Sequence, residues 1–79
     1  MDIIVREREI PEVGRTVYVL SAEPGGCGIT VRLPERSEEL RIPEICTDES
    51  AARELFELIV EGCVTPVTLR DVVYDWLCR

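Results

Sequence analysis

The clearest hydrophobic pattern in the chain lies near its C-terminus, in Thr65–Leu77. Apolar residues recur there at i, i+3, i+4, i+7 and i+8, which predicts one apolar stripe along a helix of about three turns. The stripe consists of Leu69, Val72, Val73, Trp76 and Leu77. Thr68 is placed to cap this helix, and Val67 and Val72 have the spacing of a hydrophobic staple. A helix this short is marginal alone in water, so the rest of the chain must supply a surface for it.

Another helix is predicted from Thr47 to Gly62, immediately before this C-terminal helix. Thr47 is the expected N-cap and Gly62 the expected stop, because hydroxyl residues and glycine favour these two ends. Its apolar stripe is formed by Ala52, Leu55, Phe56 and Ile59, and Leu58 is expected to widen it. The glutamates between these positions are expected to face water.

The first half of the chain alternates apolar and polar residues with the period of β strands. Strands are predicted at Asp2–Ile10, Arg15–Ser21, Ile29–Leu33 and, more briefly, around Leu40–Ile45. The first strand carries charge on both faces, which suits an edge strand because charge discourages pairing with other molecules. Pro43 cannot donate to a strand ladder, so the fourth strand should be short or lie at an edge.

This order of elements predicts an α+β fold in one domain, residues 1–79. A small antiparallel β-meander of three to four strands occupies about residues 2–46. Two C-terminal helices, about residues 47–78, pack on one face of it.

Such an arrangement leaves the other sheet face partly bare. Ile4, Tyr18 and Leu20 fall out of phase with Val17 and Val19, and we expect them on that bare face. An apolar patch of this kind is typical of a homodimer or of a surface for a protein partner.

The acidic net charge argues against nucleic acid as a partner. The formal net charge is −7 with a pI near 4.5, and the nine basic residues are scattered arginines. Nucleic acid is therefore not an expected partner, since its binding needs clustered positive charge. No apolar run approaches the roughly 20 residues of a membrane helix. The charged N-terminal segment does not resemble a signal peptide, so we expect a cytoplasmic protein without membrane contact.

The residue inventory argues against an enzyme. His and Lys are both absent, which removes the usual general base at neutral pH and the amine for Schiff-base chemistry. Asp71 and Asp75 lie one turn apart but opposite the apolar stripe, where they should be solvated. Gly25–Gly28 lacks the lysine and following helix of a phosphate loop, so it is interpreted as a hairpin loop. No catalytic residue and no cofactor are predicted.

Four cysteines, Cys27, Cys46, Cys63 and Cys78, are the remaining candidates for chemistry. They are far apart in sequence, whereas structural zinc sites normally present two ligands within a few residues of each other. Buried or incidental thiols are the main interpretation. A four-thiolate metal site and a disulfide remain as alternatives.

The helical half also resembles a known family. Two segments are similar to a domain-of-unknown-function family of short, uncharacterised Firmicutes proteins. They are the start of the Thr47–Gly62 helix, with Ile45, Thr47 and Asp48, and the ending TPVTLRDVVYDWL. Members share a DISTD-like helix start and an ending like VSPVHLRDVVEDFL. Where the family often has His, this chain has Thr68. The resemblance implies a small bacterial cytoplasmic protein and assigns no activity.

Taken together, the sequence favours a small acidic, non-enzymatic protein-interaction module that binds a protein partner or itself. The alternative is a metal- or redox-responsive protein that uses its four cysteines.

Overall fold

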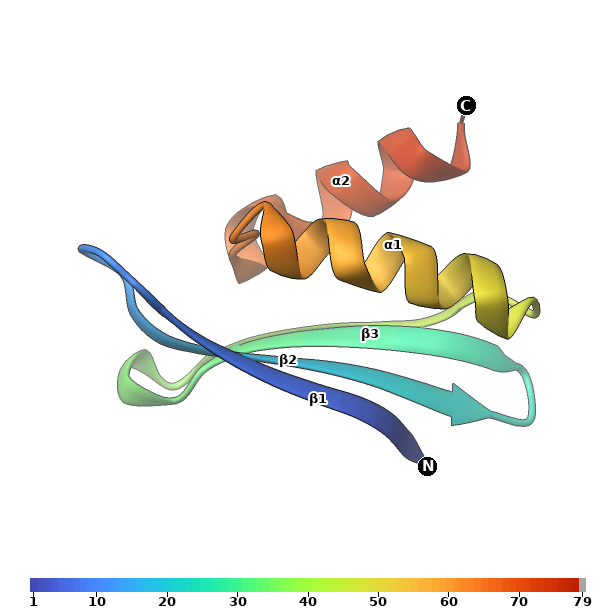
Figure 1. The fold of residues 1–79 in the computed structure, drawn as a ribbon, viewed down its shortest axis with the longest axis horizontal. Coiled ribbons are helices and arrows are strands. Elements are labelled where there is room, and N and C mark those ends of the chain that lie inside the picture. The colour runs from blue at the N-terminus through green and yellow to red at the C-terminus, as the bar shows by residue number, and fades with distance from the viewer. Residues whose placement is uncertain (79) are drawn as a thin grey trace.

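The computed structural model describes residues 1–78, and its elements follow the predicted order of strands before helices (Figure 1). The elements are β1 Asp2–Ile10, β2 Gly14–Glu23, β3 Gly26–Leu33, the short 3-10 helix η1 Pro34–Arg36, β4 Glu38–Cys46, α1 Glu49–Glu61 and α2 Pro66–Leu77. The predicted α+β class, with a β-meander before two helices, is confirmed.

The strands form one antiparallel sheet in the order β1-β2-β3-β4. The β2–β3 hairpin is tighter than predicted, because Glu23 pairs with Gly26 and only Pro24 and Gly25 remain in the loop. The glycine-rich segment is thus mostly strand.

A β-bulge explains how β4 continues past Pro43. Near Gly28 the strand register advances two residues along β3 but four along β4. A Cβ atom added at Gly28 would lie 2.9 Å from the carbonyl oxygen of Ile42. Glycine therefore permits the two backbones to approach closely, and the bulge gives Pro43 a place where no ladder N–H is needed.

Both helices cover the same face of the sheet, as predicted (Figure 1). The core lies between these two layers. Its buried members are Tyr18, Leu20, Cys27, Ile29 and Val31 from the sheet, Ala52, Leu55, Phe56, Ile59 and Val60 from α1, and Val64, Leu69 and Val73 from the end of the chain.

The N-cap of α1 lies one residue later than predicted. The Oδ1 atom of Asp48 accepts the backbone N–H of Ser50 at 2.9 Å, so Asp48 and not Thr47 is the N-cap. A carboxylate at this position also interacts favourably with the positive end of the helix dipole. The predicted residues Ala52, Leu55, Phe56 and Ile59 are buried, and Val60 joins them. Leu58, which was expected to widen the stripe, is 48% exposed.

The connection between the helices is a Schellman-type turn. The N–H of Val64 donates to the carbonyl of Ile59 and that of Cys63 to the carbonyl of Val60, both at 3.2 Å. Gly62 ends the helix as predicted, but its φ is −80°. The left-handed position, at φ 52°, is occupied by Cys63.

The N-cap of α2 lies three residues earlier than predicted. Thr65 is the N-cap and Pro66 the first helical residue, a position that suits proline because its φ is already helical and it needs no N–H partner. Thr68 is the third helical residue, and its Oγ1 accepts the backbone N–H of Thr65 at 3.4 Å. The capping box is therefore Thr65 with Thr68 rather than Thr68 with Asp71.

This shift also changes the staple. Val64 and Leu69 now occupy the staple positions, and both are buried in the core. Val67, which was predicted for that role, is 79% exposed.

The C-terminal half of α2 is only partly covered. Leu69 and Val73 are buried, whereas Val72 and Trp76 pack at the edge of the core and Leu77 is exposed. Figure 1 shows α2 rising away from the sheet toward its C-terminal end. Within residues 1–78, no helix is both long enough and apolar enough to cross a membrane.

Candidate interaction surfaces

The sheet face opposite the helices is a hollow of about 340 Å³ with a polar rim. Its floor consists of small side chains that are less than a tenth exposed, Val17, Val19, Ser21 and Thr30. Charged side chains from all four strands surround this floor. The floor is therefore shielded by its own residues, whereas Val5 of β1, which also lines the hollow, is 57% exposed.

Ion pairs link neighbouring strands around this hollow. Arg15 of β2 pairs with Glu7 of β1, and the Glu7 carboxylate raises the pKa of Arg15. Arg32 of β3 lies 2.6 Å from Glu39 of β4. Each of these side chains is about half exposed, so neither pair stabilises the fold by much. Arg32 and Glu39 also line the hollow.

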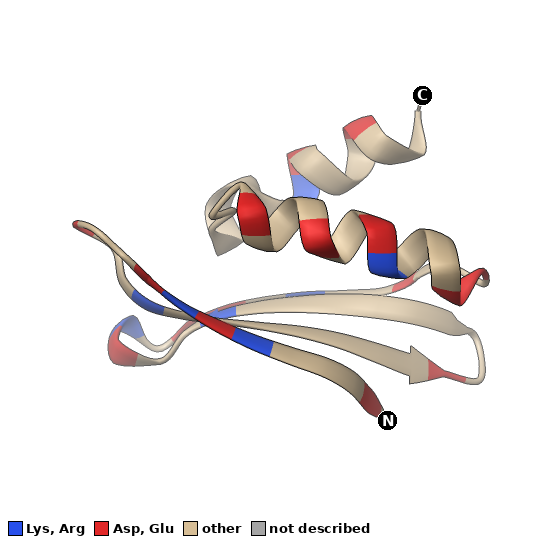
Figure 2. Ribbon diagram, viewed as in Figure 1, with Lys and Arg blue, Asp and Glu red and all other residues tan. Residues whose placement is uncertain are grey.

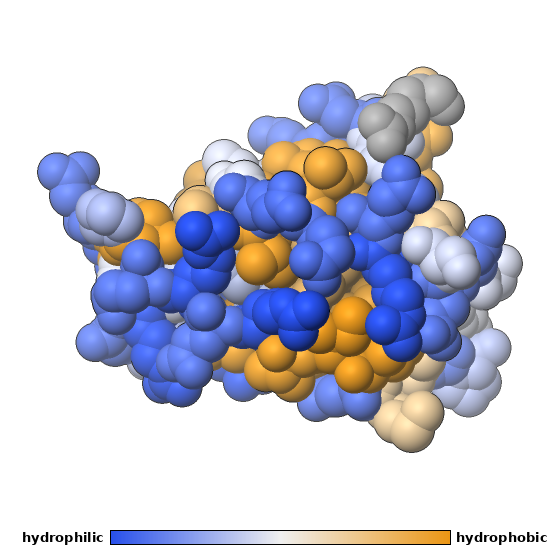
Figure 3. Space-filling model, in the orientation of Figure 1, coloured by the Kyte–Doolittle hydropathy of each residue, from blue (hydrophilic) through white to orange (hydrophobic). Residues whose placement is uncertain are grey.

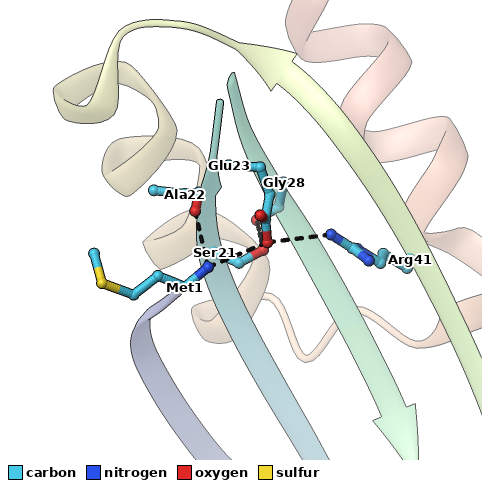
Figure 4. A network of polar contacts seen from close by, with 6 residues as sticks. All are labelled: Met1, Ser21, Ala22, Glu23, Gly28 and Arg41. Atoms are coloured by element: carbon cyan, nitrogen blue, oxygen red, sulfur yellow. Dashed lines mark hydrogen bonds and ion pairs between the residues drawn. The ribbon is translucent and has the colours of Figure 1, made fainter. Parts of the chain in front are cut away.

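Glu23 connects three parts of the sheet at one end of this hollow (Figure 4). Its Oε1 atom accepts from the N-terminal ammonium of Met1 at 3.2 Å and from Arg41 of β4 at 3.5 Å. The same ammonium donates to the carbonyl of Ala22 at 2.9 Å. The polar groups of this rim therefore largely satisfy one another.

The predicted interaction residues Ile4, Tyr18 and Leu20 lie on the other face, beneath the helices. Tyr18 and Leu20 are fully buried, and Ile4 is half-buried against the core. The face assignment is thus corrected. Apolar residues lie on both faces of β2, so its sequence does not show which face the helices cover.

Tyr18 links the sheet to the turn between the helices. Its hydroxyl donates to the carbonyl of Val64 at 2.9 Å. Burial raises the pKa of Tyr18 to about 12, with a smaller contribution from Cys63 in the same direction and an opposing one from Arg8. The neutral phenol is therefore part of the native structure.

A different apolar surface lies on one flank of α2. Val67, Tyr74 and Leu77 are 79%, 68% and 51% exposed. With Arg70 they follow the spacing i, i+3, i+7 and i+10, which is the a/d spacing of a helix that packs along another helix. We call Val67, Arg70, Tyr74 and Leu77 the α2 seam. The spacing of the seam is present in the sequence, but the longer stripe of Leu69, Val72, Val73, Trp76 and Leu77 in the same segment gives the stronger signal.

The seam borders a groove between α2 and β4. This groove measures about 290 Å³, and most of its lining is apolar. Its lining residues are Arg41, Ile42, Pro43, Arg70, Val73, Tyr74 and Leu77. In the part of the chain that the structure describes, no strand pairs with the outer edge of β4. The groove is thus open toward solvent on the edge of the molecule.

The four cysteines are free thiols in different settings. Cys27 and Cys46 are direct cross-strand partners on β3 and β4. Cys63 is half-buried in the turn between the helices, and Cys78 is exposed after α2. Among residues 1–78, no group of three or more His, Cys, Asp or Glu side chains is arranged to hold a metal ion.

Asp71 and Asp75 both lie on the exposed side of α2. Neither lines the α2–β4 groove, although Asp75 borders a second small hollow with Leu55, Leu58 and Trp76.

Hydrophilic side chains dominate the surface seen in Figure 3, with apolar surface between them near the helices and the sheet.

Comparison with known protein families gives a match over residues 16–79. It is a family of unknown function, DUF6514. The chain belongs to the DUF6514 family. No curated protein and no solved structure matches significantly.

The DUF6514 match is longer than the resemblance predicted from the tail, because it begins in β2 and includes β3 and β4. The α2 seam, the groove beside it and the Cys27–Cys46 pair all lie inside the matched range. Strand β1 precedes it.

Proposed function

We propose that this DUF6514 protein is a non-enzymatic protein-interaction module whose partner is a second copy of the same chain, bound through the α2 seam. The exposed seam is the observation that carries the proposal. Three large apolar side chains share one flank of a helix whose other side already packs on the sheet. Apolar surface gathered in this way is typical of a contact site, because a partner removes it from water.

The spacing of the seam favours a second copy over an unrelated partner. Val67 and Leu77 lie five residues on either side of Val72, and Arg70 and Tyr74 lie two residues on either side of it. Two copies of α2 that cross antiparallel about a twofold axis at Val72 would therefore place each seam residue opposite a suitable one. Val67 would meet the second copy's Leu77, and Arg70 would meet the second copy's Tyr74.

The charges of the seam are also complementary in this arrangement. The Arg70 guanidinium would lie over the Tyr74 ring of the second copy, a cation–π contact. Asp71 is next to Arg70 in the sequence and close to the same axis, so each Arg70 would also reach the other copy's Asp71. A symmetric interface forms both contacts twice.

The sheet edges are less suited to a symmetric contact. Twofold antiparallel pairing of β1 with itself aligns residues of equal parity, because the axis is perpendicular to the sheet. Even positions of the charged segment are Arg6 and Arg8, and odd positions are Glu7 and Glu9, so like charges would always face each other (Figure 2). The β4 edge contains Pro43 and a bulge, which interrupt pairing.

The seam is short, so we expect a weak dimer. An interface built from three turns of helix and the adjoining groove is smaller than the roughly 1,200–2,000 Å² of a stable complex. A dissociation constant on the order of 10 µM or above is the corresponding expectation.

Sedimentation equilibrium over a concentration series tests the proposal. The wild-type chain should shift from monomer to dimer with concentration, and Leu77→Glu should remain monomeric over the same range. Leu58→Glu is a matched control, since Leu58 is 48% exposed on α1 and lies outside the seam. A wild-type chain that stays monomeric at millimolar concentration would overturn the proposal.

Charge exchange tests the geometry of the dimer. Arg70→Asp and Asp71→Arg should each weaken association by about tenfold, because each places like charges across the axis. The double variant restores opposite charges and should recover much of the lost affinity. If the double variant associates no better than the single ones, the symmetric pairing at Val72 is wrong.

We further propose that the module acts in the cytoplasm of a bacterium, as its resemblance to Firmicutes proteins implies. Its four cysteines are free, which fits a reducing compartment.

A further inference from the structure

Cys27 and Cys46 are the one pair of cysteines that are cross-strand partners in the described sheet. Residues directly opposite in an antiparallel sheet have Cα atoms about 4.5–5.5 Å apart and side chains on the same side. That separation lies within the range of about 4.4–6.8 Å that a disulfide spans. Cross-strand pairing therefore brings the backbones of Cys27 and Cys46 into the range in which a disulfide can form.

The two thiols differ in their access to solvent. Cys27 is 5% exposed and belongs to the core, whereas Cys46 is half-buried and donates from Sγ to the carbonyl of Asp48 at 3.4 Å. Cys63 and Cys78 lack this pairing, since one lies in the turn between the helices and the other beyond α2.

We propose that Cys27 and Cys46 form a thiol–disulfide exchange site that reacts with a low-molecular-weight disulfide and closes into an intramolecular disulfide between β3 and β4. This proposal is independent of the α2 dimer. It gives the redox alternative a specific pair of residues in place of four undifferentiated cysteines.

The exchange proceeds in two steps that conserve electrons and protons. The Cys46 thiolate attacks one sulfur of the small disulfide, forms a mixed disulfide and releases one small thiol. The Cys27 thiolate then attacks the Cys46 sulfur, closes the protein disulfide and releases the second small thiol. Two protein thiols are oxidised, one disulfide is reduced, and both thiol protons end on the released small thiols.

The difference in burial sets the order of these steps. Burial raises the pKa of the Cys27 thiol, and the neighbouring Cys46 adds to this, so Cys27 is the weaker initial nucleophile. Cys46 is the more accessible and is expected to react first. Closure by Cys27 is then expected to be the step that accelerates as pH rises.

Oxidised glutathione is the probe for this site. The native chain is incubated with it, remaining thiols are alkylated, and a digest is analysed by mass spectrometry under non-reducing conditions. The expected product joins the Cys27 and Cys46 peptides, with Cys63 and Cys78 alkylated. The double variant Cys63→Ser with Cys78→Ser should form the same bridge at the same rate.

Cys46→Ser is the matched negative variant, and circular dichroism verifies that it folds. It should form no bridge and leave Cys27 slow to react. A bridge between any other pair, or a wild-type chain that stops at glutathione adducts or at four free thiols, would overturn the proposal.

Discussion

The two helices pack on the same sheet face but distribute their apolar residues differently. Helix α1 has one stripe with five buried residues, and its outer side carries four glutamates and one arginine (Figure 2). Helix α2 buries three residues and exposes a second apolar stripe, the seam. Apart from Leu58, which is 48% exposed, the large apolar residues of α1 pack in the core, whereas α2 leaves three of them exposed along the seam.

This difference suggests that separate residues control the stability of the fold and its association with a second copy. A helix needs only one apolar face to attach to a sheet, so the covered stripe of α2 already explains why it folds onto β3 and β4. The seam has no such explanation inside one chain. Residues of α1 should accordingly control unfolding, and seam residues should control association with little effect on unfolding.

The largest expected effect comes from truncating the centre of α1. Phe56 is fully buried, so Phe56→Ala should lower the free energy of unfolding by about 3–5 kcal/mol, through lost burial and a cavity. Trp76 of α2 is only half-buried, and Trp76→Ala should lower it by about 1–2 kcal/mol. Urea unfolding monitored by circular dichroism measures both. Equal losses would show that α2 is as integral to the core as α1.

The next effect concerns the contact between Tyr18 and the turn that joins the helices. The folded pKa of about 12 is above the ordinary value near 10, so the neutral phenol stabilises the fold fully below pH 10. Above that pH the unfolded chain loses the proton first, and stability should fall by about 1.4 kcal/mol per pH unit until pH 12. The total loss would be roughly 2–3 kcal/mol.

Tyr18→Phe is the control for this pH dependence. It should lose about 1 kcal/mol at neutral pH with the hydrogen bond to Val64, and its stability should depend less on pH above 10. Cys27 also has a raised pKa and remains in both chains, so the difference between them isolates Tyr18. Parallel stability curves for the two chains at high pH would contradict the assignment.

The sequence was a good guide to the fold where the hydrophobic period was strong. The stripe of Ala52, Leu55, Phe56 and Ile59 faces glutamates on most of the opposite side of its helix, so one orientation is favoured, and the structure confirms it. Strand β2 is apolar on both faces. Its pattern predicts a strand but leaves open which face the helices cover. The prediction that Tyr18 and Leu20 lie on the bare face was therefore wrong, because both are buried beneath the helices.

The helix caps show a second limit. Thr65 and Thr68 are both capping residues with plausible partners, and only the strong preference of Pro66 for the first turn distinguishes them. A three-residue shift of the cap changes the staple and, with it, the role of Val67. The position of the seam therefore could be predicted from spacing, but its exposure could not.

The cross-strand pairing of Cys27 with Cys46 was beyond sequence reasoning for a different reason. Simple counting along a hairpin assumes an unbroken register, and the bulge in β4 shifts that register around Gly28. Spacing alone therefore cannot align Cys27 and Cys46, and the distance between them along the chain gives no hint of contact.

The smallest expected effect lies at the boundary between the two helices. Cys63 adopts φ 52°, in the left-handed region, where a side chain costs roughly 1–2 kcal/mol relative to glycine. Glycine also makes the unfolded chain more flexible, which costs about 0.4–1 kcal/mol, so Cys63→Gly should gain about 0.5–1 kcal/mol in net stability. Cys63→Ala removes the same thiol but keeps the Cβ atom, and it should show no such gain. This turn sets the direction in which α2 leaves α1. Cys63→Gly should stabilise the turn without changing that direction, so the dissociation constant of the dimer should stay the same. A changed dissociation constant for Cys63→Gly, but not for Cys63→Ala, would show that the seam depends on flexibility at the turn.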